Sequence, residues 1–288
     1  MLKPLPEVFH YLDEIAFFLC MAGILVLIAE IAFRYGRRRA KKEMTADLGG
    51  QVSALGGTLL GLVALLLGFA FAMALGRFNT RQDLLRQEVN DIQAAYLRAD
   101  TLGYFRGAEM KNHLAEYTRL RVEYYTPGTL AAQMQENIAQ TDALQKKMWK
   151  NAVDLLNQAN KKTDLSPGQV SDFMGALTRV FTDENNRTAA RGNHIPEAIL
   201  WLLIFVSACA VGTVAYGVGL KGSRILLPIM VLIVAICAVL SIILDLDRPI
   251  RGIIRIGQRD MAALHEMIEK DVKAIPITRR TAVRQDGN

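Results

Sequence analysis

The chain has 288 residues, of which 51% are hydrophobic and 22% are charged, and its formal net charge is +6. Its mean hydropathy is positive, which argues against a soluble protein of this size because such a surface must stay polar. The hydrophobicity excludes a disordered chain, three cysteines exclude a disulfide-stapled module, and the modest charge argues against a nucleic-acid partner.

The apolar residues gather in four blocks, each about as long as the roughly 20 residues that cross a bilayer. The blocks cover residues 15–33, 54–75, 198–220 and 225–244. The first block is not a signal peptide, because its positive residues follow the apolar run instead of preceding it. The sequence therefore predicts an all-α integral membrane protein with four transmembrane helices, two before and two after a long insert.

The second span has a glycine-rich face. Gly57 and Gly61 form a GxxxG pair, and Gly68 falls on nearly the same face of a helix. Small residues at this spacing let helix backbones approach closely in lipid, where packing drives association. We therefore expect these glycines to pack against another helix in the deepest part of the protein.

The insert between the second and third spans is rich in helix-forming residues and contains two prolines, Pro127 and Pro167. We predict helices over residues 77–100, 108–125, 130–159 and 166–191. No helix breaker separates the second span from the first of these helices. The membrane helix is therefore expected to continue into the aqueous phase.

These patterns divide the chain into four parts. We predict a first membrane helix pair in residues 1–76, a helical extramembrane domain in 77–194 and a second helix pair in 195–245. A polar tail, residues 246–288, follows and contains an amphipathic helix over about residues 256–273.

The charges of the short loops predict a membrane orientation. Loop 34–52 contains Arg34, Arg37, Arg38, Arg39, Lys41 and Lys42, and loop 220–224 contains Lys221 and Arg224. The positive-inside rule places both loops in the cytoplasm, with the insert outside. Arginines that flank the other ends of the spans favour the reverse orientation.

No enzyme motif is present. The four histidines are scattered without a second ligand at metal-binding spacing, and the three cysteines lie inside spans, where they act as small apolar residues. Phosphate-binding loops and nucleophile elbows are also absent from the sequence. We therefore expect no enzyme, no cofactor and no metal site.

One ionisable residue, Glu30, lies inside a span. Intramembrane charges are costly and often mark an ion pathway, as in the proton-driven flagellar and outer-membrane stator families. The alternative is that Glu30 pairs with Arg34, one helical turn later, at the membrane interface.

A second candidate lies where the fourth span meets water. Asp245, Asp247, Arg248 and Arg251 could form an ion-binding or gating collar. The alternative is a helix end that intrachain salt bridges and Pro249 terminate.

A third candidate is a stripe of bulky residues on the second span: Leu67, Phe71 and Phe78. Such residues can close a pore by dewetting, and the alternative is ordinary helix packing. Arg77 and Arg81 then lie at the pore mouth, where they attract anions.

Two segments carry a resemblance to a known family. The first is EVNDIQAAYLRAD, Glu88–Asp100, just beyond the second span, and the second is LDLDRPIRGIIRI, Leu244–Ile256, just beyond the fourth. Together with the two-plus-two layout of spans, they resemble the bacterial bestrophin-like family, a domain family of unassigned function, over roughly residues 10–265.

The resemblance implies distant kinship with bestrophins, pentameric anion channels with four membrane helices per subunit. Their second helix lines the pore and runs on into a helical soluble region, and their insert lies in the cytoplasm. The resemblance thus implies a homo-oligomer, a pentamer by analogy with bestrophins, that passes chloride or other small anions. The chain departs from bestrophins in two ways: Leu48-Gly49-Gly50 stands where an Asn-Pro-Gly-like turn is expected, and the dense acidic run that serves calcium is missing.

Two main functions remain open at this point, and a proton-driven energiser, which requires Glu30 as an essential acid, is a third. The first is passive conduction of ions through an oligomer whose second span lines the pore. The second is a non-conducting scaffold or sensor, anchored in the lipid bilayer, whose extramembrane domain binds a partner. A closed ring found by cross-linking favours the channel, whereas a monomer or dimer favours the scaffold.

Overall fold

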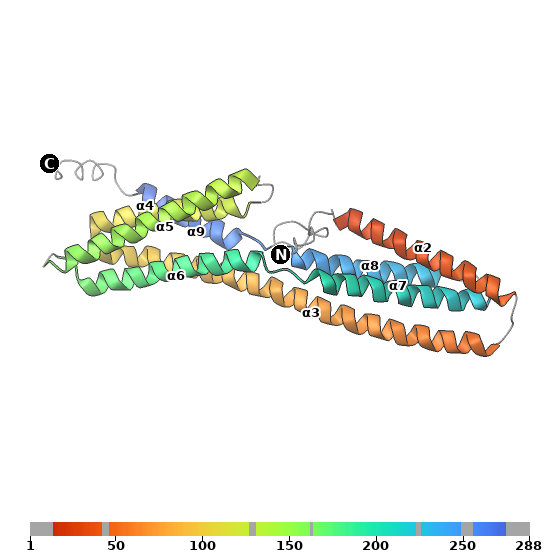
Figure 1. Ribbon diagram of the computed structural model, residues 1–288. Coiled ribbons are helices and arrows are strands. Elements are labelled where there is room, and N and C mark those ends of the chain that lie inside the picture. The colour runs from red at the N-terminus through yellow and green to blue at the C-terminus, as the bar shows by residue number, and fades with distance from the viewer. Residues whose placement is uncertain are drawn as a thin grey trace, which may run out of the picture. The chain divides into compact units, whose positions relative to one another are not determined.

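The computed structural model describes residues 14–41, 46–126, 131–161, 164–222, 226–248 and 256–274. Every regular element in these ranges is helical (Figure 1). The elements are α2 (Glu14–Ala40), α3 (Ala46–Ala99), the 3-10 turn η1 (Asp100–Leu102), α4 (Tyr104–Tyr124), α5 (Ala131–Ala159), α6 (Pro167–Arg191), α7 (Glu197–Leu220), α8 (Leu226–Asp247) and α9 (Arg259–Ala274). The predicted all-α class is confirmed.

Four helices, α2, α3, α7 and α8, are long and apolar enough to cross a membrane. α3 has 54 residues, far more than the roughly 20 that span a bilayer, so it continues beyond the membrane as the sequence predicts. Helices α4, α5 and α6 follow it in the chain before α7 begins. Four spans with a helical insert between the second and third are therefore confirmed.

The chain divides into two compact units, each with its own apolar core. The first unit contains Met1–Asn79 and His194–Arg255, and the second contains Thr80–Asn193 and Ile256–Asn288. α3 contributes its first part to one unit and its second part to the other.

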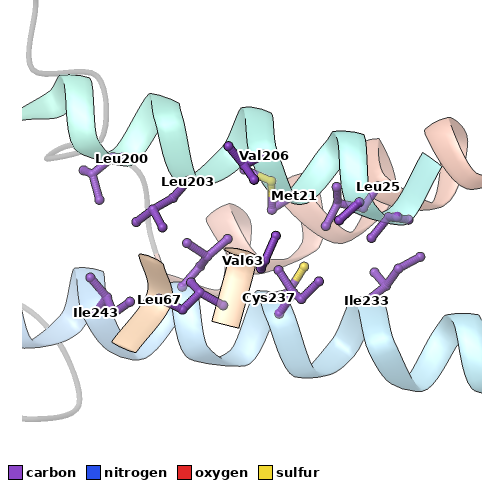
Figure 2. Close-up of a cluster of buried hydrophobic side chains, with 14 of the residues drawn as sticks. Met21, Leu25, Val63, Leu67, Leu200, Leu203, Val206, Ile233, Cys237 and Ile243 are labelled. Carbon is purple, nitrogen blue, oxygen red and sulfur yellow. The ribbon is translucent and has the colours of Figure 1, made fainter. Parts of the chain in front are cut away.

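The core of the first unit is formed by all four membrane helices. Figure 2 shows Val63 and Leu67 of α3 among residues of α2, α7 and α8. The closest backbone contact joins α2 and α7, where a Cβ on Gly36 would collide with the carbonyl oxygen of Tyr216, and one on Gly219 with that of Phe33. Earlier on both helices, a Cβ on Gly212 would lie 3.4 Å from Ile28 Cγ2, so α2 and α7 are parallel neighbours whose last turns lie on the same side.

The second unit is a bundle of the later part of α3 with α4, α5, α6 and α9. The amphipathic helix α9 packs on α4 and buries Met261, Leu264, Ile268 and Val272. Three polar contacts fix it: the Tyr96 hydroxyl donates to Asp271 at 2.5 Å, Lys111 Nζ lies 3.5 Å from the same carboxylate, and the Thr118 hydroxyl lies 3.0 Å from His265 Nδ1. The tail helix predicted over residues 256–273 is thus part of the bundle.

Candidate functional site

The membrane part of α3 presents two different faces. Its inward face carries Val63, Leu67, Ala70 and Ala74, which are buried in the core of the first unit. Their spacing of three or four residues keeps them on one side of the helix. This stripe attaches α3 to the other membrane helices through side chains.

The outward face of α3 has no packing partner in the part of the chain that the structure describes. No atom of another helix lies within 4 Å of the position that a Cβ would take on Gly57, Gly61 or Gly68. Near these small residues, Leu65 is 54% exposed and Phe69 is 63% exposed. The glycine face predicted for helix packing is therefore turned away from its own subunit.

The three predicted constriction residues do not share one environment on α3. Leu67 is buried and Phe78 is partly buried, and both pack on the membrane core. This placement favours ordinary packing for these two residues, whereas Phe71 is exposed. Leu65 and Phe69 are not among the constriction residues predicted from the sequence. Helical periodicity places both of them opposite the Val63–Ala74 stripe and is the signal that identifies them.

The two predicted pore-mouth arginines also have partners within the chain. The Arg81 guanidinium is buried and donates to the carbonyl oxygens of Ala190 at 3.1 Å and Asn193 at 2.8 Å. The Arg77 guanidinium lies 3.9 Å from the sulfur of Met73. Arg81 therefore attaches α3 to the last turn of α6 and to the residues just after it, within the second unit.

The acidic motif at the end of α8 connects two helices. The Asp247 carboxylate accepts the backbone N–H of Ile195 with both oxygens, at 3.1 and 3.2 Å, and contacts His194 Nδ1 at 3.2 Å. Asp245 and Arg248 are buried beside it. This geometry ties the end of α8 to the start of α7 and favours the helix-end interpretation. The fourth residue of the predicted collar, Arg251, lies outside the described residues.

Glu30 pairs with Arg34, as the interpretation of an ion pair at the membrane interface requires. Its carboxylate accepts a hydrogen bond from Arg34 Nε at 2.7 Å, and both side chains are partly exposed. The pair lies in the last turns of α2, which ends at Ala40. An essential intramembrane acid, as in a proton-driven stator, gains no support from this position.

A buried ionic cluster lies inside the second unit. Glu88 has no exposed surface and accepts hydrogen bonds from Arg121 Nε and Arg187 Nη1, both at 2.6 Å. Arg121 also reaches Glu184 at 3.1 Å, and the Arg187 guanidinium lies 3.6 Å from the centre of the Tyr125 ring. The cluster joins α3, α4 and α6 through paired charges, as buried charges require. Across the described ranges, no three His, Cys, Asp or Glu side chains gather where they could hold a metal ion.

Sequence comparison relates the chain to one family. The family model of the bestrophin-like domain matches residues 19–261, which is most of the chain. The chain belongs to the bestrophin-like domain family. A comparison with curated proteins finds no match.

Solved structures of bacterial bestrophin homologues share the fold of this bestrophin-like chain. A tryptophan-to-alanine variant of the Klebsiella pneumoniae homologue is 12% identical, with a TM-score of 0.66 over 91% of this chain and 97% of the other. The same homologue, solved by zinc phasing, is 13% identical, with a TM-score of 0.60 over 88% and 96%. At these identities the likeness establishes the fold.

The first family motif of the bestrophin-like chain has an architectural role. Glu88 forms the centre of the buried cluster, Asp91 accepts a hydrogen bond from Arg179 at 3.2 Å, and Tyr96 donates to Asp271. These residues follow α3 at helical spacing and point toward α4, α6 and α9. The motif therefore holds the second unit together around α3.

One acid beside this cluster has a strongly shifted pKa. Asp183 of α6 is buried, and its Oδ1 accepts a hydrogen bond from Gln87 Nε2 at 2.8 Å. Burial, a hydrogen bond to the Asp91 carboxyl and the nearby charges of Asp91 and Glu88 raise the pKa of Asp183 from 3.8 to about 7. No local sequence pattern indicates this pKa shift, because Asp91 and Asp183 are far apart in the chain.

Proposed function

We propose that this chain is one subunit of a homo-oligomeric, non-enzymatic channel that passes small ions, chloride among them, across the bacterial inner membrane. α3 of each subunit faces the central axis. The observation that carries this proposal is the outward face of α3, which is apolar, rich in glycine and without a partner in the described part of its own subunit.

Two kinds of residue on this face perform two tasks. Gly57, Gly61 and Gly68 let α3 helices of neighbouring subunits approach closely. Leu65 and Phe69 are the bulky exposed residues next to them, and a ring of such side chains narrows a pore and closes it by dewetting. Leu65 and Phe69 replace Leu67 and Phe78 in this proposal, because the latter pack inside the subunit.

The family supports an assembly of several copies. Bestrophins, to which the resemblance points, are pentamers with the second membrane helix at the pore, and α3 is the second membrane helix here. The second unit then lies in the cytoplasm, as the resemblance implies. The opposite orientation, predicted from loop charge, is the alternative that labelling distinguishes.

Ion flux from liposomes tests the proposal. Purified protein should release chloride from loaded vesicles, and Phe69→Ala should increase the flux because it widens the apolar ring. Phe205→Ala is the matched control, since Phe205 is a phenylalanine of similar exposure, 65%, on α7. Absence of flux from the wild-type protein and from Phe69→Ala would refute the channel.

Cross-linking tests the assembly separately. A ladder of bands that ends at a closed ring supports the pore around α3. A monomer or dimer instead favours the scaffold or sensor, because neither can enclose a pathway with one α3 face per subunit.

A further inference from the structure

In the part of α3 beyond the membrane span, some charged side chains are buried and others are exposed. Arg81 and Glu88 are buried, and their polar atoms bind backbone carbonyls and guanidinium groups. Asp83 and Arg86 point outward, and their side chains are 74% and 57% exposed.

The exposed charges continue the outward face described for the membrane part. Asp83 lies five helical turns after Leu65, and Arg86 lies five turns after Gly68. Because α3 is an unbroken helix over Ala46–Ala99, helical periodicity gives Asp83 the register position of Leu65 and Arg86 that of Gly68. They are the first strongly exposed charged residues that follow Phe69 along α3.

The two charges nearly cancel. Arg86 Nη1 lies 3.6 Å from Asp83 Oδ1, a loose contact between residues three apart on the helix. Both groups stay hydrated, so each remains available to an ion that passes. A ring of subunits then presents equal numbers of acids and bases at one level.

We propose that Asp83 and Arg86 determine the charge selectivity of the pore, an inference that rests on the proposed channel function. With both residues present, the pore discriminates weakly between anions and cations. If one is neutralised, the other forms a ring of a single sign, which concentrates ions of the opposite charge.

Reversal potentials of the reconstituted channel in a potassium chloride gradient test this inference. Asp83→Asn should shift the chloride-to-potassium permeability ratio toward chloride, by about tenfold at low ionic strength. Arg86→Gln should shift it toward potassium by a similar factor, and the double variant should return close to the wild-type value. Both shifts should decrease at high salt, because the charges are exposed and become screened.

A pair of the same kind on another helix provides the control. Glu266 and Lys270 are exposed on α9 and form a 2.6 Å ion pair one turn apart. Glu266→Gln and Lys270→Gln should leave the reversal potential unchanged. Channels that conduct normally but show the wild-type reversal potential in both α3 variants would overturn the selectivity role and leave the channel intact. A wild-type protein that conducts no ions would overturn both.

Discussion

Glu88 has no exposed surface, yet it accepts hydrogen bonds from two guanidinium groups. Burial of these charges is tolerable because each one has a partner, and removal of one partner leaves the others uncompensated. Loss of Glu88 would therefore be costly because Arg121 and Arg187 would remain buried without their shared carboxylate.

Glu88→Gln should destabilise the second unit by about 3–5 kcal/mol, because two buried arginines lose their shared carboxylate. Thermal unfolding of the purified protein in detergent measures the loss. Glu116→Gln is the control, since Glu116 pairs with Arg119 at the surface and should cost about 0–1 kcal/mol. Equal losses of stability in the two variants would show that the buried ionic cluster around Glu88 does not contribute more than a surface ion pair.

The raised pKa of Asp183 predicts how the free energy of unfolding depends on pH. The folded-state pKa of this residue, about 7, lies above the ordinary value of 3.8, so the folded protein holds the proton more tightly than the unfolded chain does. The stabilising contribution of this proton is complete below pH 3.8 and is lost as the pH rises through about 7. Unfolding midpoints measured across this window should fall with pH in the wild-type protein.

Asp183→Asn should flatten that pH profile, because an amide keeps the hydrogen-bonding shape without titrating. An unchanged slope in the variant would assign the pH dependence to another group. Asp172→Asn is a suitable control, because Asp172 is an exposed aspartate on the same helix.

The roles of single residues were the hardest part to predict. Arg81 and Arg86 are both arginines that follow the second span, and the sequence does not distinguish them. Arg81 is buried because the carbonyls of Ala190 and Asn193 lie beside it, more than a hundred residues later in the chain. A long-range contact of this kind leaves no local pattern.

At the scale of elements, the continuous α3 was predictable because the absence of a breaker is a local property. The pairing of α2 with α7 was not. A glycine pattern indicates that some helix can approach closely, but it does not identify the partner. In the structure, Gly36 and Gly219 provide the close contact within the subunit, and Gly57, Gly61 and Gly68 remain open.

The two groups of glycines should therefore respond differently to the same substitution. Gly219→Leu should prevent the subunit from folding, because even a Cβ at this position collides with the backbone of α2. Gly61→Leu should leave the folded subunit intact and reduce its assembly, because its surroundings in the subunit are open. Size-exclusion chromatography in detergent separates these outcomes, and full assembly of Gly61→Leu would contradict the proposed α3 interface.

At the scale of the molecule, two arguments give opposite orientations. Loop charge places Arg37, Arg38 and Arg39 in the cytoplasm, whereas the bestrophin resemblance places the insert there. The close packing of α2 on α7 puts the ends of both helices on one side, so a single labelling experiment locates both loops.

The proposed function places the second unit in the cytoplasm. In a background with the three native cysteines replaced by alanine, Arg38→Cys should react with an impermeant maleimide in intact cells. Asp142→Cys, on the exposed side of α5, should react after permeabilisation. The reverse pattern would establish the orientation that loop charge predicts.

The position of α9 at the end of the described chain means that the second unit is completed only after the last membrane helix has been synthesised. Helix α9 covers α4 with Met261, Leu264, Ile268 and Val272, but it is translated after the last membrane span. While α7 and α8 are entering the bilayer, the nascent bundle of α4–α6 keeps an uncovered apolar strip. Chaperones and proteases act on such surfaces, so a chain that stalls during insertion stays open to degradation. Closure by α9 thus marks a subunit whose membrane insertion is finished.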